Sequence, residues 1–155
     1  MINYISIVGI IGLMICFYAI YVEKKTKLDK NYSPFCNISN NMKCSVVLES
    51  KYSRMMKLIF DLKKDNIFNL PNTYYGVLFY IAIIIYPLYP FNLIPFREAL
   101  LFAISVFSIL LCFLLAFILY FKLRNCCIIC IAIYIVNIVI YYIACNELNK
   151  MINRF

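Results

Sequence analysis

Of the 155 residues, 65% are hydrophobic and 14% are charged, which excludes an ordinary soluble domain, since such a domain is about half apolar and about a quarter charged. The formal net charge is +8, but ten of the fifteen Lys and Arg residues lie in the segment from Glu23 to Asp65, which also contains five acidic residues. This mixed-sign segment indicates contact with the headgroups of a lipid bilayer rather than with nucleic acid.

Four apolar windows are each long enough to cross a bilayer, which takes about 20 helical residues. They contain no charged residue and predict transmembrane helices at about residues 3–22, 73–89, 99–121 and 126–146. The first window is interpreted as a retained helix, because it lacks the basic start and the small-residue cleavage site of a secretory signal. Short connections between the later windows predict antiparallel neighbours. The expected fold is therefore an all-α membrane protein, a four-transmembrane-helix bundle that forms one domain over residues 1–155.

The long extramembrane loop, residues 23–72, lies between the first two predicted helices. Its first part, Lys24 to Lys43, is polar and has no apolar period, which indicates irregular structure. From Ser50 to Asp65, apolar residues recur at helical spacing opposite a basic face, which predicts an amphipathic helix at the headgroup boundary. Two roles stay open for this helix, a surface anchor and a lid that gates a substrate.

Cysteine is the informative residue, with eight copies in a chain that has no histidine. With four spans, the long loop and the connection between the third and fourth helices share one side of the membrane. This topology brings five cysteines near that face: Cys36, Cys44, Cys126, Cys127 and Cys130. The remaining three are interpreted as small buried apolar side chains: Cys16, Cys112 and Cys145.

The Cys127-Ile-Ile-Cys130 motif stands where the fourth helix begins. The spacing places both sulfurs on one helix face, within reach of a disulfide, and a helix N-terminus favours the reactive thiolate. A zinc site would need Cys36 and Cys44 as further ligands, but seven intervening residues are not the usual spacing of a zinc knuckle. The motif therefore predicts a redox pair and no metal site.

Polar and sulfur-containing residues continue along the same face of the fourth helix at intervals of three and four: Cys127, Cys130, Tyr134, Asn137 and Tyr141. At membrane depth such side chains face the bundle interior. Asn137 is interpreted mainly as an interhelical hydrogen-bonding residue. Tyr134, one turn below Cys130, is placed to donate a hydrogen bond to a carbonyl oxygen. An apolar pocket with a few donors suits a flat lipophilic ligand such as a quinone.

These residues resemble the vitamin K epoxide reductase family and its paralogues. The resemblance is carried by Cys36 and Cys44 with seven residues between them, by Ser45, and by the Cys127-Ile-Ile-Cys130 motif with Tyr134 and Asn137. The segment Asp65-Asn-Ile-Phe-Asn-Leu-Pro-Asn72-Thr-Tyr-Tyr-Gly76 also looks like that family's approach to its second helix. The similarity extends from about Phe17 to about Tyr142. Two positions depart from the family pattern, Leu48 and Ile133, and Cys126 is an additional thiol.

The resemblance implies a role for each residue. Cys130 would attack the substrate and Cys127 would resolve the adduct. Cys44 would shuttle electrons to Cys127, and Cys36 would receive them from a thioredoxin-like redox protein acting in trans. Hydrogen bonds to the two substrate oxygens would come from Asn72 and Tyr134. The substrate would be vitamin K epoxide or a vitamin K type quinone, with no tightly bound cofactor.

Redox chemistry and the resemblance together imply a multi-pass protein of the endoplasmic reticulum membrane with its active site facing the lumen, or of an inner membrane in a bacterial cell. The sequons Asn31-Tyr-Ser33 and Asn37-Ile-Ser39 agree with a lumenal loop. The charges point the other way, because twelve Lys and Arg residues lie on the loop side and three lie opposite. The lumenal orientation is expected, because cytosolic reductants would defeat a disulfide relay.

Two other functions fit the same residues. One is a quinone-dependent oxidase that generates disulfides in thioredoxin-like proteins of the secretory pathway, since sequence does not encode the direction of electron flow. The other is a membrane scaffold without enzymatic activity, whose cysteines are purely structural.

Overall fold

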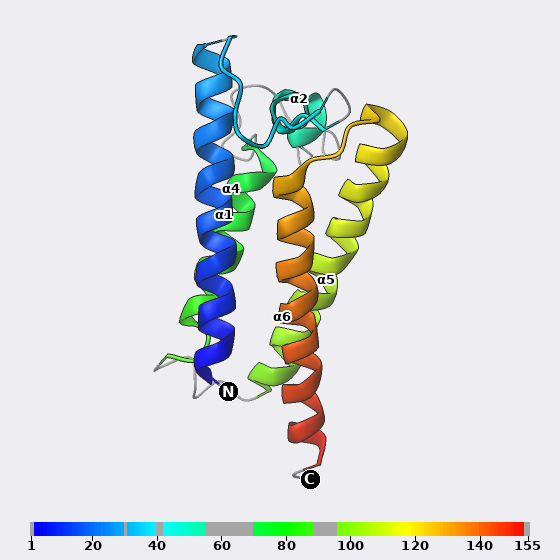
Figure 1. Cartoon of the computed structure of the whole chain (residues 1–155). Coiled ribbons are helices and arrows are strands. Elements are labelled where there is room, and N and C mark those ends of the chain that lie inside the picture. The colour runs from blue at the N-terminus through cyan, green and yellow to red at the C-terminus, as the bar shows by residue number, and fades with distance from the viewer. Residues whose placement is uncertain (1, 30, 40–41, 55–69, 89–95, 154–155) are drawn as a thin grey trace.

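Four helices form a bundle, and a short helix covers one end of it (Figure 1). The computed structural model describes residues 2–29, 31–39, 42–54, 70–88 and 96–153. The bundle helices are α1 (Ile2–Leu28), α4 (Asn72–Ile85), α5 (Arg97–Ile118) and α6 (Ile128–Ile152). α1 packs on both α4 and α6, and α5 packs on α6. The covering elements are α2 (Cys44–Glu49) and the 3₁₀ turn η1 (Lys51–Ser53), and a π-helical turn, η3 (Leu119–Leu123), continues α5.

Within the described residues, three helices are long and apolar enough to cross a membrane: Tyr4–Leu28, Arg97–Leu123 and Ile128–Ile152. Helix α4 is apolar but has 14 residues, which at 1.5 Å per residue gives about 21 Å against a hydrocarbon core of about 30 Å. The all-helical membrane architecture is therefore confirmed, and the described residues contain no β-strand beyond one isolated bridge, between Ser39 and Met42. The fourth membrane span stays a prediction.

The helices continue past the apolar windows from which they were predicted. Helix α1 runs to Leu28, so the prediction of irregular structure from Lys24 is wrong for residues 24–28. Glu23 and Lys27 form an ion pair one turn apart, and such a pair supports helix that hydropathy alone does not detect. Helix α6 likewise extends beyond residue 146, where Glu147 pairs with Lys150.

Most of the predicted amphipathic helix lies outside the described residues. Of Ser50 to Asp65, the structure describes residues 50–54, of which Lys51–Ser53 form η1. Of the connection from Pro90 to Phe96, the structure describes Phe96 alone. Helix α4 ends at Ile85, two residues before Pro87, in agreement with the helix-stopping role expected of proline.

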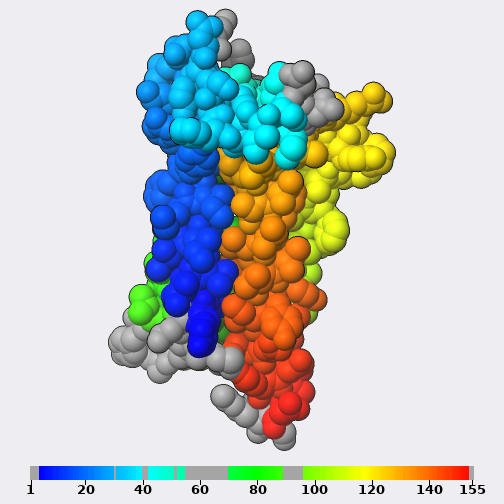
Figure 2. Space-filling view, viewed as in Figure 1, coloured from blue at the N-terminus to red at the C-terminus, as the bar shows by residue number. Residues whose placement is uncertain are grey.

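Two clusters of buried side chains make up the core. One lies within the bundle and includes Tyr80, Ile140 and Ala144. The other lies at the loop end, where residues of α1 and α2 enclose three cysteines: Cys36, Cys44 and Cys127. On the face shown in Figure 2, α1 and α6 lie side by side and the residues before and within α2 cover their ends. The loop is thus part of the packed structure, and Cys36, Cys44 and Cys127 are buried at its end of the bundle.

Small residues let α1 and α4 approach closely. A Cβ atom added at Gly12 would lie 2.2 Å from the Tyr80 ring, and one added at Gly9 would lie 2.9 Å from the Ile84 side chain. Helices in membranes commonly associate through such small residues. Because Tyr80 is 1% exposed and its hydroxyl donates to Asn137 on α6, the contact at Gly12 fixes a ring that connects α4 to α6.

Replacing Gly12 with Val should therefore destabilise the bundle. Overpacking of this kind costs about 1–3 kcal/mol, which we expect as a lower apparent melting temperature in detergent, measured by thermal unfolding. Ile11→Val is the matched control, because Ile11 is 48% exposed on the same helix. An unchanged melting temperature for Gly12→Val would contradict the tight contact.

Candidate functional site

Four thiols form a continuous chain from the extramembrane loop to the start of α6. Neighbouring thiol groups lie near enough to interact electrostatically in sequence, Cys36 with Cys44, Cys44 with Cys127, and Cys127 with Cys130. The Cys44 Sγ also donates to the Cys36 carbonyl oxygen over 3.4 Å. All eight cysteines of the chain are free thiols. The structure therefore brings together the four cysteines that the sequence singled out, in the order in which a relay would use them.

The Cys127–Cys130 pair is held by the way α6 begins. Cys127 is the N-cap residue, with an extended backbone, and its Sγ accepts a hydrogen bond from the Cys130 backbone N–H over 3.4 Å. The turn before it passes through Arg124 in the left-handed region, at φ 50°. Cys127 thus takes the place of the polar side chain that usually caps a helix. This hydrogen bond holds the Cys127 sulfur against the Cys130 backbone at the start of α6.

The loop pair is positioned by a reciprocal contact between Asn37 and Ser45. The Asn37 Nδ2 donates to Ser45 Oγ over 2.9 Å, and the Ser45 backbone N–H donates to Asn37 Oδ1 over 3.3 Å. Within the loop that they close, the Ile38 N–H donates to the Met42 carbonyl. Since Cys36 precedes Asn37 and Cys44 precedes Ser45, this contact places the two cysteines side by side.

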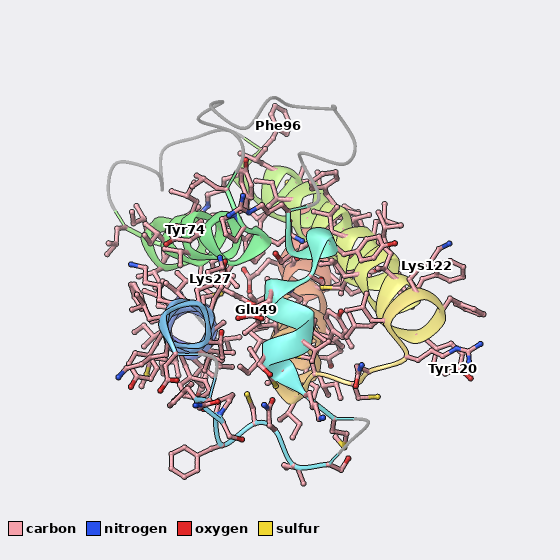
Figure 3. The ribbon with its side chains drawn as sticks, turned by 90° about the horizontal axis from the view of Figure 1, so that it is seen from above. Lys27, Glu49, Tyr74, Phe96, Tyr120 and Lys122 are labelled. Carbon is pink, nitrogen blue, oxygen red and sulfur yellow. The ribbon has the colours of Figure 1, made fainter. Side chains whose placement is uncertain are left out.

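Helix α2 carries Cys44 over the end of α6 (Figure 3). Its buried residues are Cys44, Val47 and Leu48, which pack with Ala19 and Val22 of α1. This short helix was absent from the sequence prediction, because six residues are too few to show a clear helical period. It is the element that brings the loop thiol to Cys127.

Raised pKa values keep Cys36, Cys44 and Cys127 predominantly protonated at neutral pH. Burial, with a smaller contribution from the neighbouring Cys44, raises the pKa of Cys36 to about 12. The pKa of Cys44 is raised chiefly by its hydrogen bond with Cys127, and then by burial. At Cys127, just outside the membrane-spanning part of α6, the hydrogen bond with Cys130 is the largest effect and raises the pKa, outweighing the Cys130 backbone N–H, which lowers it. A thiolate therefore forms here when a proton is removed during reaction.

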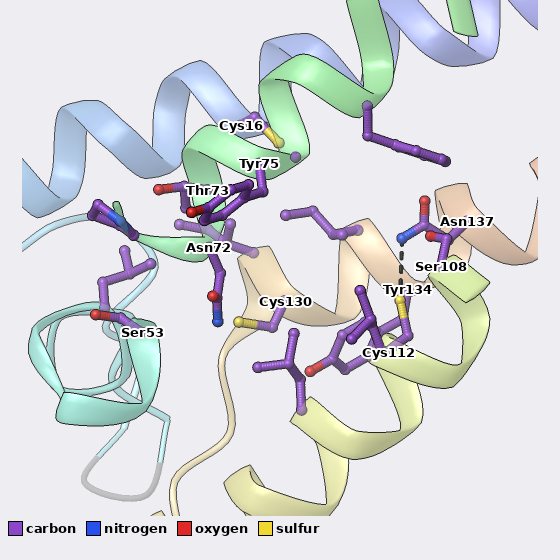
Figure 4. A pocket seen from close by; sticks show the side chains of 18 of the residues that line it. Cys16, Ser53, Asn72, Thr73, Tyr75, Ser108, Cys112, Cys130, Tyr134 and Asn137 are labelled. Atoms are coloured by element: carbon purple, nitrogen blue, oxygen red, sulfur yellow. Dashed lines mark hydrogen bonds between the residues drawn. The ribbon is translucent and has the colours of Figure 1, made fainter. Parts of the chain in front are cut away.

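A cavity of about 630 Å³ lies beside Cys130, enclosed by the four bundle helices, α2 and η1. Its wall is almost entirely apolar. Polar groups reach it from several helices, and Figure 4 shows the main ones around the same space. Those labelled there include Asn72, Thr73, Cys130, Tyr134 and Asn137. Such a cavity has the size and character of a site for a lipophilic small molecule.

Asn72 and Tyr134, the two predicted substrate-binding residues, both line this cavity. In Figure 4 the Cys130 thiol lies between them. Asn72 is the first residue of α4, and its Nδ2 donates to the Tyr52 carbonyl over 3.2 Å. The Tyr134 hydroxyl is buried and has no hydrogen-bond partner among the described residues. A buried unsatisfied hydroxyl is rare in proteins, and here it faces a space that a ligand could fill.

Asn137 joins three helices below the thiols. It accepts a hydrogen bond from the Tyr80 hydroxyl of α4 over 3.1 Å and donates to the Cys112 Sγ of α5 over 3.1 Å. The interpretation of Asn137 as an interhelical residue is confirmed, although it also forms part of the cavity wall.

Sequence reasoning missed two features of the site. Cys16 and Cys112 line the cavity, whereas they were interpreted only as buried apolar side chains. Glu23, assigned to the loop, is a buried residue of α1 and also lines the cavity. The signal that could have placed Glu23 on a helix is Lys27, four residues later. Cys126 is exposed, next to the buried Cys127.

The contact between Asn37 and Ser45 generates a prediction about access to the loop thiols. Asn37→Ala removes both hydrogen bonds, each worth about 1 kcal/mol, so the loop should open more often and maleimide should label Cys36 and Cys44 roughly tenfold faster. Asn31→Ala is the matched control, since Asn31 lies exposed in the same loop. Site-resolved mass spectrometry of labelled peptides measures the rates. Equal rates in the two variants would show that the contact does not hold the loop.

Comparison with known proteins agrees with this arrangement. The sequence model of the "Vitamin K epoxide reductase family" matches residues 3–145. The chain is 32% identical over 130 residues to "Vitamin K epoxide reductase complex subunit 1" of Mus musculus, covering 82% of this chain and 78% of the mouse protein. To the protein of the same name from Rattus norvegicus it is 30% identical over 129 residues, covering 81% of this chain and 77% of the rat protein.

Proposed function

The chain belongs to the vitamin K epoxide reductase family, and we propose that it is a membrane thiol–disulfide oxidoreductase that reduces vitamin K epoxide or a quinone of that type. The observation that carries the proposal is the unbroken chain of thiols from Cys36 to Cys130, which ends at an apolar cavity. Thiol–disulfide exchange requires each attacking sulfur to reach the next, and this chain meets that requirement. The lipophilic substrate occupies the cavity.

The reaction with a quinone uses Cys130 as the nucleophile. The Cys130 thiolate adds to a ring carbon, forming a C–S bond, and an electron pair moves to the substrate oxygen. Cys127 then attacks the Cys130 sulfur, so that an S–S bond forms and the C–S bond breaks. The dithiol loses two electrons and two protons, and the quinone gains them to become a hydroquinone. An epoxide substrate takes up the same electrons and protons and gives the quinone and water.

The loop pair restores the active dithiol. Cys44 attacks the disulfide at Cys127, the outer of the two sulfurs, and Cys36 resolves the mixed disulfide. The oxidised Cys36–Cys44 pair is then reduced by the dithiol of a thioredoxin-like protein acting in trans. This order follows the contacts of the thiol chain, in which Cys44 touches Cys127 and Cys36 touches Cys44.

Substrate oxygens are bound at opposite sides of Cys130. Tyr134 supplies its unpaired hydroxyl to one oxygen, and Asn72 supplies its amide to the other. Both residues line the cavity from different helices, α6 and α4. We extend the proposal to the setting: α4 is the fourth membrane span, and the protein lies in the endoplasmic reticulum membrane with the thiol chain on the lumenal side.

Cysteine substitutions separate the two steps of this mechanism. Cys130→Ala should abolish reduction of a vitamin K type quinone with every electron donor, because the nucleophile is lost. Cys36→Ala should retain activity with a small membrane-permeant dithiol, which reduces the Cys127–Cys130 disulfide directly, and lose it with a thioredoxin-like donor. Quinone absorbance in purified, lipid-reconstituted protein follows the reaction. Cys145→Ala is the control on α6, outside both pairs. Turnover by Cys130→Ala would refute the mechanism.

Removing the Tyr134 hydroxyl tests substrate binding. Tyr134→Phe should lower kcat/KM by about 100-fold, the usual effect of deleting one hydrogen-bond donor to a developing oxyanion. Tyr142→Phe is the matched control, because Tyr142 is 67% exposed on the same helix. Steady-state kinetics with the permeant dithiol as donor isolates this step from the loop pair. If both variants behaved like the unmodified protein, Tyr134 would have no part in binding the substrate.

A further inference from the structure

A buried carboxylate forms part of the cavity wall. Glu23, near the end of α1, is 3% exposed and lines the cavity. Its Oε1 atom forms an ion pair with Lys27, one turn further along the helix. Its Oε2 atom is buried and accepts no hydrogen bond from any residue in the described part of the chain. A charged oxygen in apolar surroundings is unfavourable without a partner, so Oε2 is suited to receive a proton or a hydrogen bond from a group in the cavity.

In the described cavity wall, Glu23 is the one side chain of an acidic or basic residue type. The remaining polar groups there are thiols, hydroxyls and amides, with no aspartate, lysine or arginine among them. The chain also contains no histidine, the side chain that most often transfers protons at neutral pH. Glu23 is therefore the base that the described part of the cavity offers.

The proposed reaction requires such a base. A thiol attacks as its thiolate, so the Cys130 proton must leave before the C–S bond forms, and the substrate oxygen must later gain a proton. The amide of Asn72 does not transfer protons. A phenol such as Tyr134, with an ordinary pKa of about 10, does not accept one at neutral pH.

We infer that Glu23 is the proton-exchanging group of the cavity, an inference that rests on the proposed function. Its carboxylate accepts the proton of Cys130 as the thiolate forms, and the resulting carboxylic acid gives that proton to the substrate oxygen that receives the electron pair. When Cys127 closes the disulfide, its own proton goes to the second substrate oxygen. The quinone gains two electrons and two protons, the dithiol loses them, and Glu23 returns to its starting state.

Lys27 connects this group to the aqueous side. Its ammonium contacts Glu23 Oε1, and its side chain is 46% exposed, while that of Glu23 is 4% exposed. Figure 3 shows Lys27 on the side of α1 that faces α2 and α4. Because Oε1 is engaged by Lys27, Oε2 is the oxygen left for the reaction.

Kinetics of three variants test the role of Glu23. The assay follows reduction of 2-methyl-1,4-naphthoquinone by full-length protein in lipid nanodiscs with excess dithiothreitol, corrected for the uncatalysed rate. Glu23→Gln should lower kcat by about 100-fold, as expected on removal of a general base, with KM changed by less than about threefold. Glu23→Asp keeps a carboxylate and should recover at least about tenfold of that loss. Glu147→Gln removes the similar ion pair with Lys150 on α6 and should leave kcat unchanged.

An infrared measurement separates proton transfer from a structural role. Forming the Cys130 adduct with the quinone in a Cys127→Ala background, where no resolving thiol is present, should produce the C=O stretching band of a protonated carboxyl group that decays as the proton passes to the substrate. The band should shift in Glu23→Asp and persist in Glu147→Gln. A purely structural role for Glu23 would lower thermal stability without giving this band.

The outcomes distinguish this inference from the proposed function. Absence of quinone reduction by the unmodified protein would refute the proposed function itself. If the unmodified protein is active and Glu23→Gln retains kcat within about twofold, the proposed function stands and the role of Glu23 is refuted. If Glu23→Gln does not fold, the infrared measurement decides. The role of Glu23 is then refuted if the carboxyl band is absent, or if the band is identical in the Cys127→Ala and Cys127→Ala/Glu23→Asp proteins.

Discussion

Contact between sulfur atoms is the constraint on which the rest of the structure depends. Electrons pass along thiols by covalent exchange, so each sulfur must reach the next. Here Cys36, Cys44 and Cys127 are at most 7% exposed and belong to one hydrophobic cluster. Three of the four sulfur atoms thus belong to the core, and the apolar packing that stabilises the loop end also holds together the residues of the proposed relay. The helix start at Cys127 and the contact between Asn37 and Ser45 supply the two polar attachments that this cluster needs.

Much of the site could be predicted because its spacing is local. Cys130 follows Cys127 by three residues, and Tyr134 lies one helical turn further along. Once the helix was recognised in the sequence, the relative positions of these residues followed from helix geometry. The approach of the loop cysteines to Cys127 was expected from the topology. An even number of membrane crossings separates the loop from Cys127, so both lie on the same side of the membrane. What escaped prediction depends on tertiary contacts. Helix α2 is stabilised by packing on α1 rather than by its own six residues. Glu23 was assigned to the loop because a hydropathy pattern ends a predicted span at the first charged residue, whereas the helix itself continues past that residue.

The bundle beneath the thiols is organised around the same cavity. Asn137 connects α4, α5 and α6 through Tyr80 and Cys112, while Gly12 lets the Tyr80 ring approach α1. Polar braces and small residues at such positions are typical of helices that associate within lipid, where apolar side chains provide little driving force. Fixing the helices in this way keeps a space open between them, with the unpaired hydroxyl of Tyr134 and the carboxylate of Glu23 in its wall.

The burial of Cys36 also limits which reductants reach its thiol. With the thiol 7% exposed and its loop closed by Asn37 and Ser45, a small dissolved thiol collides with the loop without meeting the sulfur. A macromolecule can offset the cost of opening the loop with its own binding free energy, which a small thiol lacks. In the proposed relay, the closed loop therefore slows reduction of the loop pair by small dissolved thiols and favours a donor that first binds the protein, whereas a membrane-permeant dithiol bypasses the loop by reducing the Cys127–Cys130 disulfide directly.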